Sequence, residues 1–122
     1  MKYELSVLKN FSSAHALREY KGKCENLHGH NWKIKVTFEG VKLDDTGMLI
    51  DFGDIKAFLS QIITGLDHKF LNETPPFDVL NPTAENIAAY IFKELRRFET
   101  ATASVGSVEV WESDTSSAKV SL

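Results

Sequence analysis

The sequence is poor in several features that would assign it to a secreted or membrane class. Only one of its 122 residues is cysteine, so no disulfide can form within a single chain and a reducing compartment is expected. No apolar run approaches the roughly 20 residues that cross a bilayer, and the first residues, MKYELSVLKNFSSA, lack the apolar core of a secretory signal. Repeats and low-complexity segments are also missing. The sequence therefore predicts a soluble, cytoplasmic protein.

Positive charge is scarce as well. Lysine and arginine total 14 against 17 aspartates and glutamates, which gives a formal net charge of −3. The basic residues are scattered, and only Arg96 and Arg97 are adjacent. Nucleic-acid backbones require concentrated positive charge, so neither nucleic acid nor a membrane is an expected partner.

What is present is the pattern of one mixed domain over residues 1–122. Apolar residues alternate with polar ones from Tyr3 to Val7, which predicts a strand that continues past Phe11. The same period from His30 to Phe38 predicts a second strand. Alternation returns after Ser104, followed by a short last strand whose apolar residues are Ala118, Val120 and Leu122.

Helical spacing appears between these two pairs of strands. The first stripe predicts a helix over about residues 54–64, with Asp51 or Asp54 as its N-cap. Thr83 is placed to cap a second helix, whose buried stripe comprises Ile87, Ala88, Ile91, Phe92 and Leu95. The order is ββααββ, an α+β fold with an antiparallel sheet. Helices on one face leave the other face and both sheet edges uncovered, which favours oligomerisation.

Two of the four histidines, His28 and His30, share one face of the second strand because they are two residues apart. Two imidazoles can grip one metal ion if a third ligand arrives, and His15 near the end of the first strand is the candidate. A catalytic zinc typically has three protein ligands, such as three histidines, and a fourth coordination position that is open to water or substrate. The alternative is an ordinary exposed or hydrogen-bonded histidine pair.

Cys24 lies four residues before His28 and admits three interpretations. It could be a fourth ligand of a structural zinc, a catalytic thiolate activated by a nearby cation, or an inert buried thiol.

Two further groups could carry acid and base chemistry. Asp67 directly precedes His68, and a carboxylate beside an imidazole can orient it and raise its basicity, although a histidine that merely follows a helix is the alternative. Glu112 shares its side of the third strand with Val108 and Val110, so its carboxylate is expected on the apolar face, where it would need donor partners. If the strand ends earlier, Glu112 is simply solvated.

Six segments, taken together and in order, resemble the 6-pyruvoyltetrahydropterin synthase superfamily, most closely its bacterial 6-carboxytetrahydropterin synthase branch. They span most of the chain: FSSAH, CENLHGHNW, GMLIDFGDIK, LDHKFLN, NPTAENIA and VEVWES. The spacing C-x-x-x-H-G-H is similar to the carboxy-forming branch. Ser113, where threonine is frequent, and Lys69, where some relatives have histidine, depart from the common pattern.

The resemblance implies roles for individual residues. His15, His28 and His30 match the zinc ligands, and Cys24 matches the catalytic thiol. The acid/base pair is matched by Asp67 and His68, the glutamate that anchors the pterin by Glu112, and a weaker pterin contact by Thr83. Arg18, Lys21 and Lys23 are the nearest cations for a triphosphate.

The resemblance also implies a tunnelling fold, in which strands of three subunits close a barrel and two trimers stack as a homohexamer with active sites at subunit interfaces. The implied reaction converts 7,8-dihydroneopterin triphosphate to 6-carboxy-5,6,7,8-tetrahydropterin, acetaldehyde and triphosphate on the route to queuosine. The alternatives are a 6-pyruvoyltetrahydropterin synthase, a dihydroneopterin aldolase-like activity, and a non-catalytic zinc- or pterin-binding protein.

Overall fold

The computed structural model describes residues 1–19 and 26–122. Along the chain, two strands are followed by two helices and then by two more strands. The strands are β1 (Tyr3–His15), β2 (His28–Gly40), β3 (Ser104–Ser113) and β4 (Ser116–Ser121). The helices are α1 (Phe52–Thr64) and α2 (Ala84–Leu95), and two short 3₁₀ turns follow them at Leu71–Glu73 and Arg96–Phe98. The predicted ββααββ order and α+β class are confirmed.

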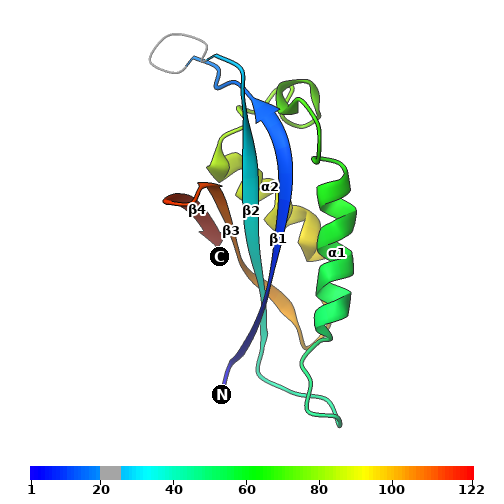
Figure 1. Cartoon of the computed structure of the whole chain (residues 1–122). Coiled ribbons are helices and arrows are strands. Elements are labelled where there is room, and N and C mark those ends of the chain that lie inside the picture. Colours follow the sequence, from blue (N-terminus) through cyan, green and yellow to red (C-terminus); the bar gives the residue numbers. More distant parts are fainter. Residues whose placement is uncertain (20–25) are drawn as a thin grey trace.

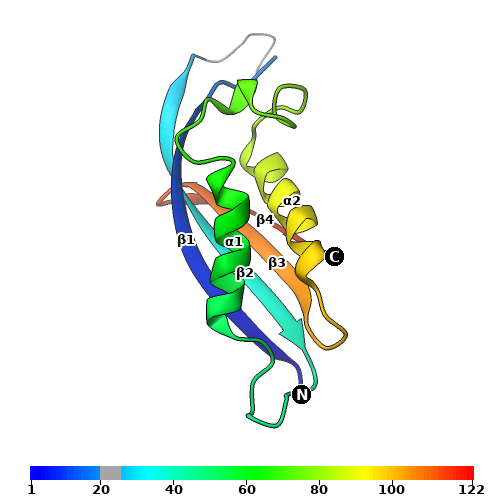
Figure 2. The same ribbon diagram turned by 90° about the vertical axis from the view of Figure 1, so that its right-hand side faces the viewer.

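The sheet is antiparallel throughout, with the strands in their sequence order, so β1 and β4 form its edges. Both helices lie on the same face, α1 against β1 and α2 against β3 and β4 (Figures 1 and 2). Within one chain the sheet is open. The end of β1 is covered, since Ser12 and Ala14 bond to residues 67–70. Elsewhere the edge strands offer backbone donors and acceptors that another chain could pair with.

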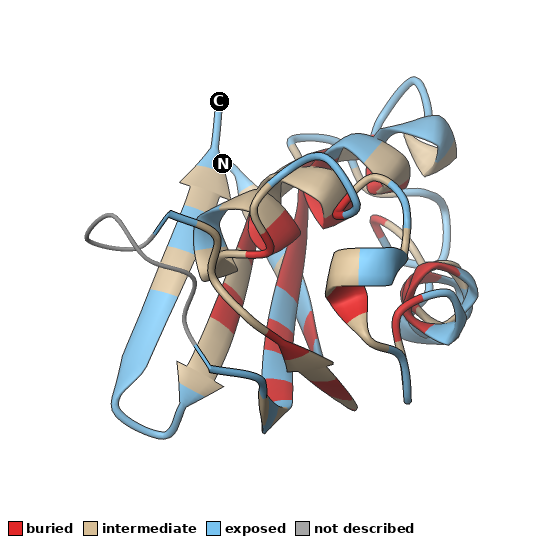
Figure 3. Ribbon diagram, turned by 90° about the horizontal axis from the view of Figure 1, so that it is seen from above, coloured by how far each residue is buried: buried red, intermediate tan, exposed pale blue. Residues whose placement is uncertain are grey.

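The core lies between the sheet and the helices, where alternation along the strands and helical stripes meet (Figure 3). On β2, every second residue from Trp32 to Phe38 is fully buried, while the lysines between them face the other side. The predicted stripe of α2 is buried in full. No helix among the described residues is long and apolar enough to span a membrane.

The helix starts show how local sequence sets the boundaries. The Asp51 carboxylate accepts a hydrogen bond from the Gly53 N–H, so α1 begins at Phe52, two residues before the predicted start. Phe52 and Gly53 are exposed, so burial of an apolar stripe does not mark the start of this helix. Thr83 caps α2 as predicted, accepting from the Asn86 N–H. At the chain's end, Leu122 is 92% exposed and lies outside β4, contrary to its predicted place in the last strand.

The strands are longer than their apolar patterns because the polar ends still pair. β1 and β2 remain in register as far as the pair His15 and His28, whereas β3 pairs with β2 only from Lys33 onward among the described residues. The last residues of β1 and the first of β2 thus form a two-stranded extension beyond β3. His15, His28 and His30 lie on this extension.

Candidate metal centre and active site

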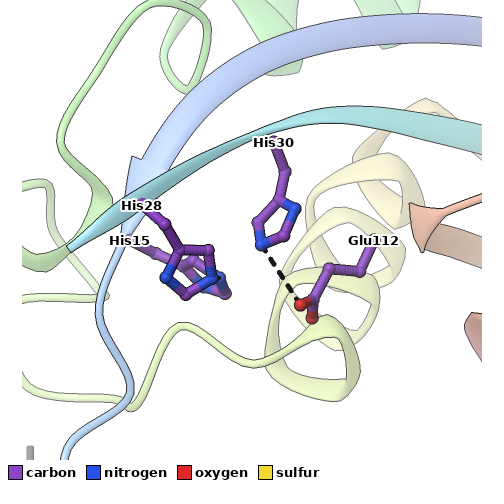
Figure 4. Close-up of side chains that lie close together, drawn as sticks. All are labelled: His15, His28, His30 and Glu112. Carbon is purple, nitrogen blue, oxygen red and sulfur yellow. Dashed lines mark hydrogen bonds and ion pairs between the residues drawn. The ribbon is translucent and has the colours of Figure 1, made fainter. Parts of the chain in front are cut away.

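Three histidines converge at the extension of β1 and β2 (Figure 4). His15 and His28 are direct cross-strand partners, and His30 follows His28 by two residues on the same face. Their ring centroids lie 4.5 to 4.9 Å apart. The predicted approach of His15 to the HGH pair is therefore confirmed as geometry.

Hydrogen bonds to backbone carbonyls fix the orientation of two of these rings. The Nδ1 atom of His15 lies 2.7 Å from the Pro82 carbonyl oxygen, and that of His28 lies 2.8 Å from the Asn26 carbonyl oxygen. A carbonyl can only accept, so both Nδ1 atoms carry the proton and donate it. In the neutral rings, both Nε2 atoms then present lone pairs.

Those two Nε2 atoms face each other at 3.1 Å. Two lone pairs at this distance repel unless an additional proton or a metal ion lies between them. Nitrogens that bind one zinc ion at 2.0–2.1 Å are about 3.3 Å apart in a tetrahedral site, close to the observed spacing. The donor set and its outer hydrogen bonds therefore fit a metal ion.

Trp32 forms the inner wall of the cluster. The indole is fully buried, and it meets the rings of His15 and His30 edge to face at centroid distances of 5.0 and 5.2 Å. It also stacks on Phe11 at 6.0 Å. This packing restricts the imidazole rotamers and keeps water from the inner side of the site.

Glu112 approaches the histidines from the end of β3. Its Oε1 lies 3.2 Å from the Nε2 of His30, and its carboxylate and the three imidazoles offer ligand atoms within 4.8 Å of one another. The pairing of β3 with β4 is irregular between Trp111 and Ser113, and such bulges redirect a side chain. The expected placement of Glu112 on the apolar side is confirmed.

Glu112 also lines a pocket of about 380 Å³, whose described lining includes none of the three histidines. Its lining combines the first residues of α2, Ala84 and Glu85, with the β3–β4 hairpin. Thr83, just before this lining, uses its hydroxyl oxygen to accept the helix-capping bond. A bicyclic ligand fits such a volume, and Glu112 borders both the pocket and the histidines.

Asp67 and His68 form a separate pair beside the edge strand β1. The His68 Nδ1 lies 3.0 Å from Asp67 Oδ1, which also accepts the Ser12 backbone N–H at 2.9 Å. That backbone bond, supported by the bond to His68, holds the pKa of Asp67 below its usual range. The carboxylate is therefore ionised at neutral pH and can orient the imidazole.

The position of His68 differs from that of the other histidines. Its side chain is 82% exposed, and the described metal-ligand cluster does not include it. Its backbone is left-handed, with φ of 55°, and is held by a bond from its N–H to the Ser12 carbonyl. Because α1 ends at Thr64, His68 is not a helix-terminal histidine. The backbone of Ser12 therefore holds Asp67 and His68 beside the edge strand β1, with the His68 side chain in solvent.

Cys24, Lys21 and Lys23 lie outside the described residues, so their predicted roles rest on the sequence. Arg18 is described, and its guanidinium donates to three backbone carbonyls. Sequence patterns missed the carbonyl partners of His15 and His28. The one available signal was the NPT segment, whose proline and threonine mark a helix start next to the site.

Comparisons with known proteins identify the class. Residues 4–121 match the family model described as 6-pyruvoyl tetrahydropterin synthase, so the chain belongs to this family. It is 38% identical over 115 residues to a 6-carboxy-5,6,7,8-tetrahydropterin synthase of Synechocystis, covering 90% of this chain and 86% of that protein. The Haemophilus influenzae protein of the same name is 34% identical over 137 residues, covering 93% and 95%.

The fold agrees with this assignment. A 6-pyruvoyl tetrahydropterin synthase of Caenorhabditis elegans superposes with a TM-score of 0.86 at 27% identity, covering 100% of this chain and 96% of that one. The chain thus has the tunnelling fold and is a lyase-type enzyme of the pterin synthase kind.

Proposed function

We propose that the protein converts 7,8-dihydroneopterin triphosphate to 6-carboxy-5,6,7,8-tetrahydropterin, acetaldehyde and triphosphate, as a zinc enzyme of the cytoplasm on the route to queuosine. The observation that carries the proposal is the adjacency of the two halves of the site. Glu112 belongs to the cluster with the three histidines and also lines a pterin-sized pocket. The relatives named for the carboxy product, and the Cys24-x-x-x-His28 spacing, favour this branch.

The histidines would hold the metal through Nε2, while their Nδ1 bonds keep these atoms directed inward. A zinc ion bound there would supply Lewis-acid chemistry to the side-chain hydroxyls of the substrate. Glu112 would accept two parallel N–H bonds from the amidine-like edge of the pterin and so fix the ring relative to the cluster.

Proton transfers would fall to the thiol and to the exposed pair. Cys24, as thiolate, would take a proton from a side-chain carbon. His68, held by Asp67, would move protons at the oxygens as triphosphate leaves and the carbon chain breaks. One water molecule supplies the second oxygen of the carboxyl product.

The exposed position of His68 at the sheet edge is accessible to a neighbouring subunit. Because His68 is outside the cluster of its own chain, we propose that it serves the cluster of a neighbouring subunit. Pairing of the open edges of β1 and β4 between chains would build a barrel and bring such sites together in a homohexamer.

Product analysis tests the reaction directly. Zinc-loaded protein mixed with dihydroneopterin triphosphate should yield the 6-carboxy product and acetaldehyde by mass spectrometry, and protein stripped of metal should yield neither. The 6-pyruvoyl product would place the chain in the other branch, and a 6-hydroxymethyl pterin with glycolaldehyde triphosphate would indicate the aldolase-like activity. If zinc and pterin bind without turnover, the chain is a binding protein.

Glu112→Gln tests the pterin anchor. The amide keeps the shape but loses the charge and one acceptor, so kcat/KM should fall about 100-fold or more, mainly through weaker substrate binding, while zinc content stays unchanged. Glu109→Gln is the matched control, because Glu109 lies on the opposite face of β3 and accepts from Ser117. If Glu112→Gln loses zinc and binds substrate normally, Glu112 is a metal ligand instead.

A further inference from the structure

The segment that follows His15 is fastened by two asparagine side chains from a distant loop. Asn72 accepts the Ala16 N–H at 2.9 Å and donates to the Ala16 carbonyl at 2.7 Å. Asn81 does the same for Arg18, at 2.8 and 3.1 Å. Each amide satisfies both backbone groups of one residue, as a neighbouring strand would, although β1 has already ended.

The Arg18 side chain adds further hydrogen bonds between the segment after His15 and the loop that carries Asn72 and Asn81. Its guanidinium donates to the carbonyl oxygens of Asn72, Phe77 and Leu80 at 2.7 to 3.1 Å. Three of its five N–H donors are therefore used to hold the loop. This engagement gives Arg18 a structural task that the predicted triphosphate contact does not explain.

The same loop leads directly to the imidazole of His15. Pro82, next to Asn81, is buried and accepts the His15 Nδ1–H. The Asn81 carbonyl in turn accepts the Thr83 N–H and the Asn86 side-chain amide, both at 2.8 Å, at the start of α2. Pro82 thus directly follows a residue, Asn81, that is bonded both to the start of α2 and to the Arg18 backbone.

His15 is therefore held at two points by residues 72–86: through its ring by Pro82 and through the following backbone by Asn72 and Asn81. We infer that Asn72 and Asn81 are positioning residues that direct the Nε2 of His15 and so set the metal affinity of the three-histidine cluster. The inference rests on the proposed metal site. Partners in the outer shell of metal sites typically change affinity by 10–100-fold when they are removed.

The competing interpretation is that the asparagines only stabilise a surface loop. The two interpretations differ in what Asn81→Ala changes. A positioning role predicts a fall of about 10-fold or more in zinc affinity, measured by chelator competition, and an altered visible absorption spectrum of the cobalt-substituted protein, since that spectrum reports the geometry around the metal. A purely structural role predicts a lower melting temperature of the metal-free protein with affinity and spectrum unchanged.

Asp44→Ala is the matched control. The Asp44 carboxylate also accepts three hydrogen bonds, from Thr46 and Met48, in the loop between β2 and α1. This loop lies at the end of the molecule opposite the histidine cluster (Figure 1). The control should lose stability and keep wild-type zinc affinity and cobalt spectrum.

Asn72→Ala and the milder Asn81→Asp, which retains the acceptor for the Arg18 N–H, keep the test decisive if Asn81→Ala does not fold. Folded variants that bind zinc like the wild type would overturn the inference and leave the proposed function intact. An equal loss of affinity in Asp44→Ala would also overturn it. If the wild type itself binds no zinc, the inference and the proposed metal site both fail.

Discussion

Replacing His28 with alanine should strip the protein of its metal and reduce turnover below detection. The side chain supplies one of two Nε2 lone pairs that face each other at 3.1 Å, so its removal leaves two imidazoles at the centre. Loss of a direct ligand should exceed the roughly 100-fold loss of affinity caused by the largest outer-shell changes. Zinc content after dialysis, measured by atomic emission, and product formation are the two readouts.

His28 is a better choice for this test than His15. His15 is fully buried against Trp32, so its replacement would leave a cavity and an unmatched Pro82 carbonyl, and unfolding would obscure the metal effect. The fourth histidine is the matched control: His68→Ala should retain one zinc per chain. A His28→Ala protein that binds zinc with wild-type affinity would contradict the three-histidine site.

The sequence predicted the elements of the fold well because each is amphipathic. Alternation on β2 and the helical stripe of α2 report directly which side chains face the core. Boundaries were less accurate where the chain leaves the core. The exposed start of α1 and the polar ends of β1 and β2 are fixed by capping and cross-strand bonds, which apolar periodicity does not report.

The metal cluster was also accessible from sequence, since two histidines two residues apart on a strand must share a face. His15 could be suggested as their partner, but only the register of β1 with β2 places it directly opposite His28. The Pro82 and Asn26 carbonyls that orient the rings could not be predicted, because any residue offers a backbone carbonyl. The exposure of His68 likewise depends on how residues 66–70 run beside β1.

The exposure of the His68 side chain bears on how a complete active site is assembled. His68→Ala should retain zinc and fold normally, because its side chain is 82% exposed, yet turnover should fall by about 100-fold or more when the acid/base group is removed. If His68 serves a neighbouring subunit, a mixture of His28→Ala and His68→Ala chains should recover activity that neither variant has alone.

The recovered activity should have a defined size. When the two variants are refolded together and mix at random, about one site in four combines an intact histidine cluster with an intact His68, so activity should approach a quarter of the wild-type value. A mixture of His28→Ala and His30→Ala is the control, since every cluster then lacks one ligand and no recovery is possible. Mixed oligomers that are visible by native mass spectrometry but inactive would show that His68 acts within its own chain, and the interface site would have to be abandoned.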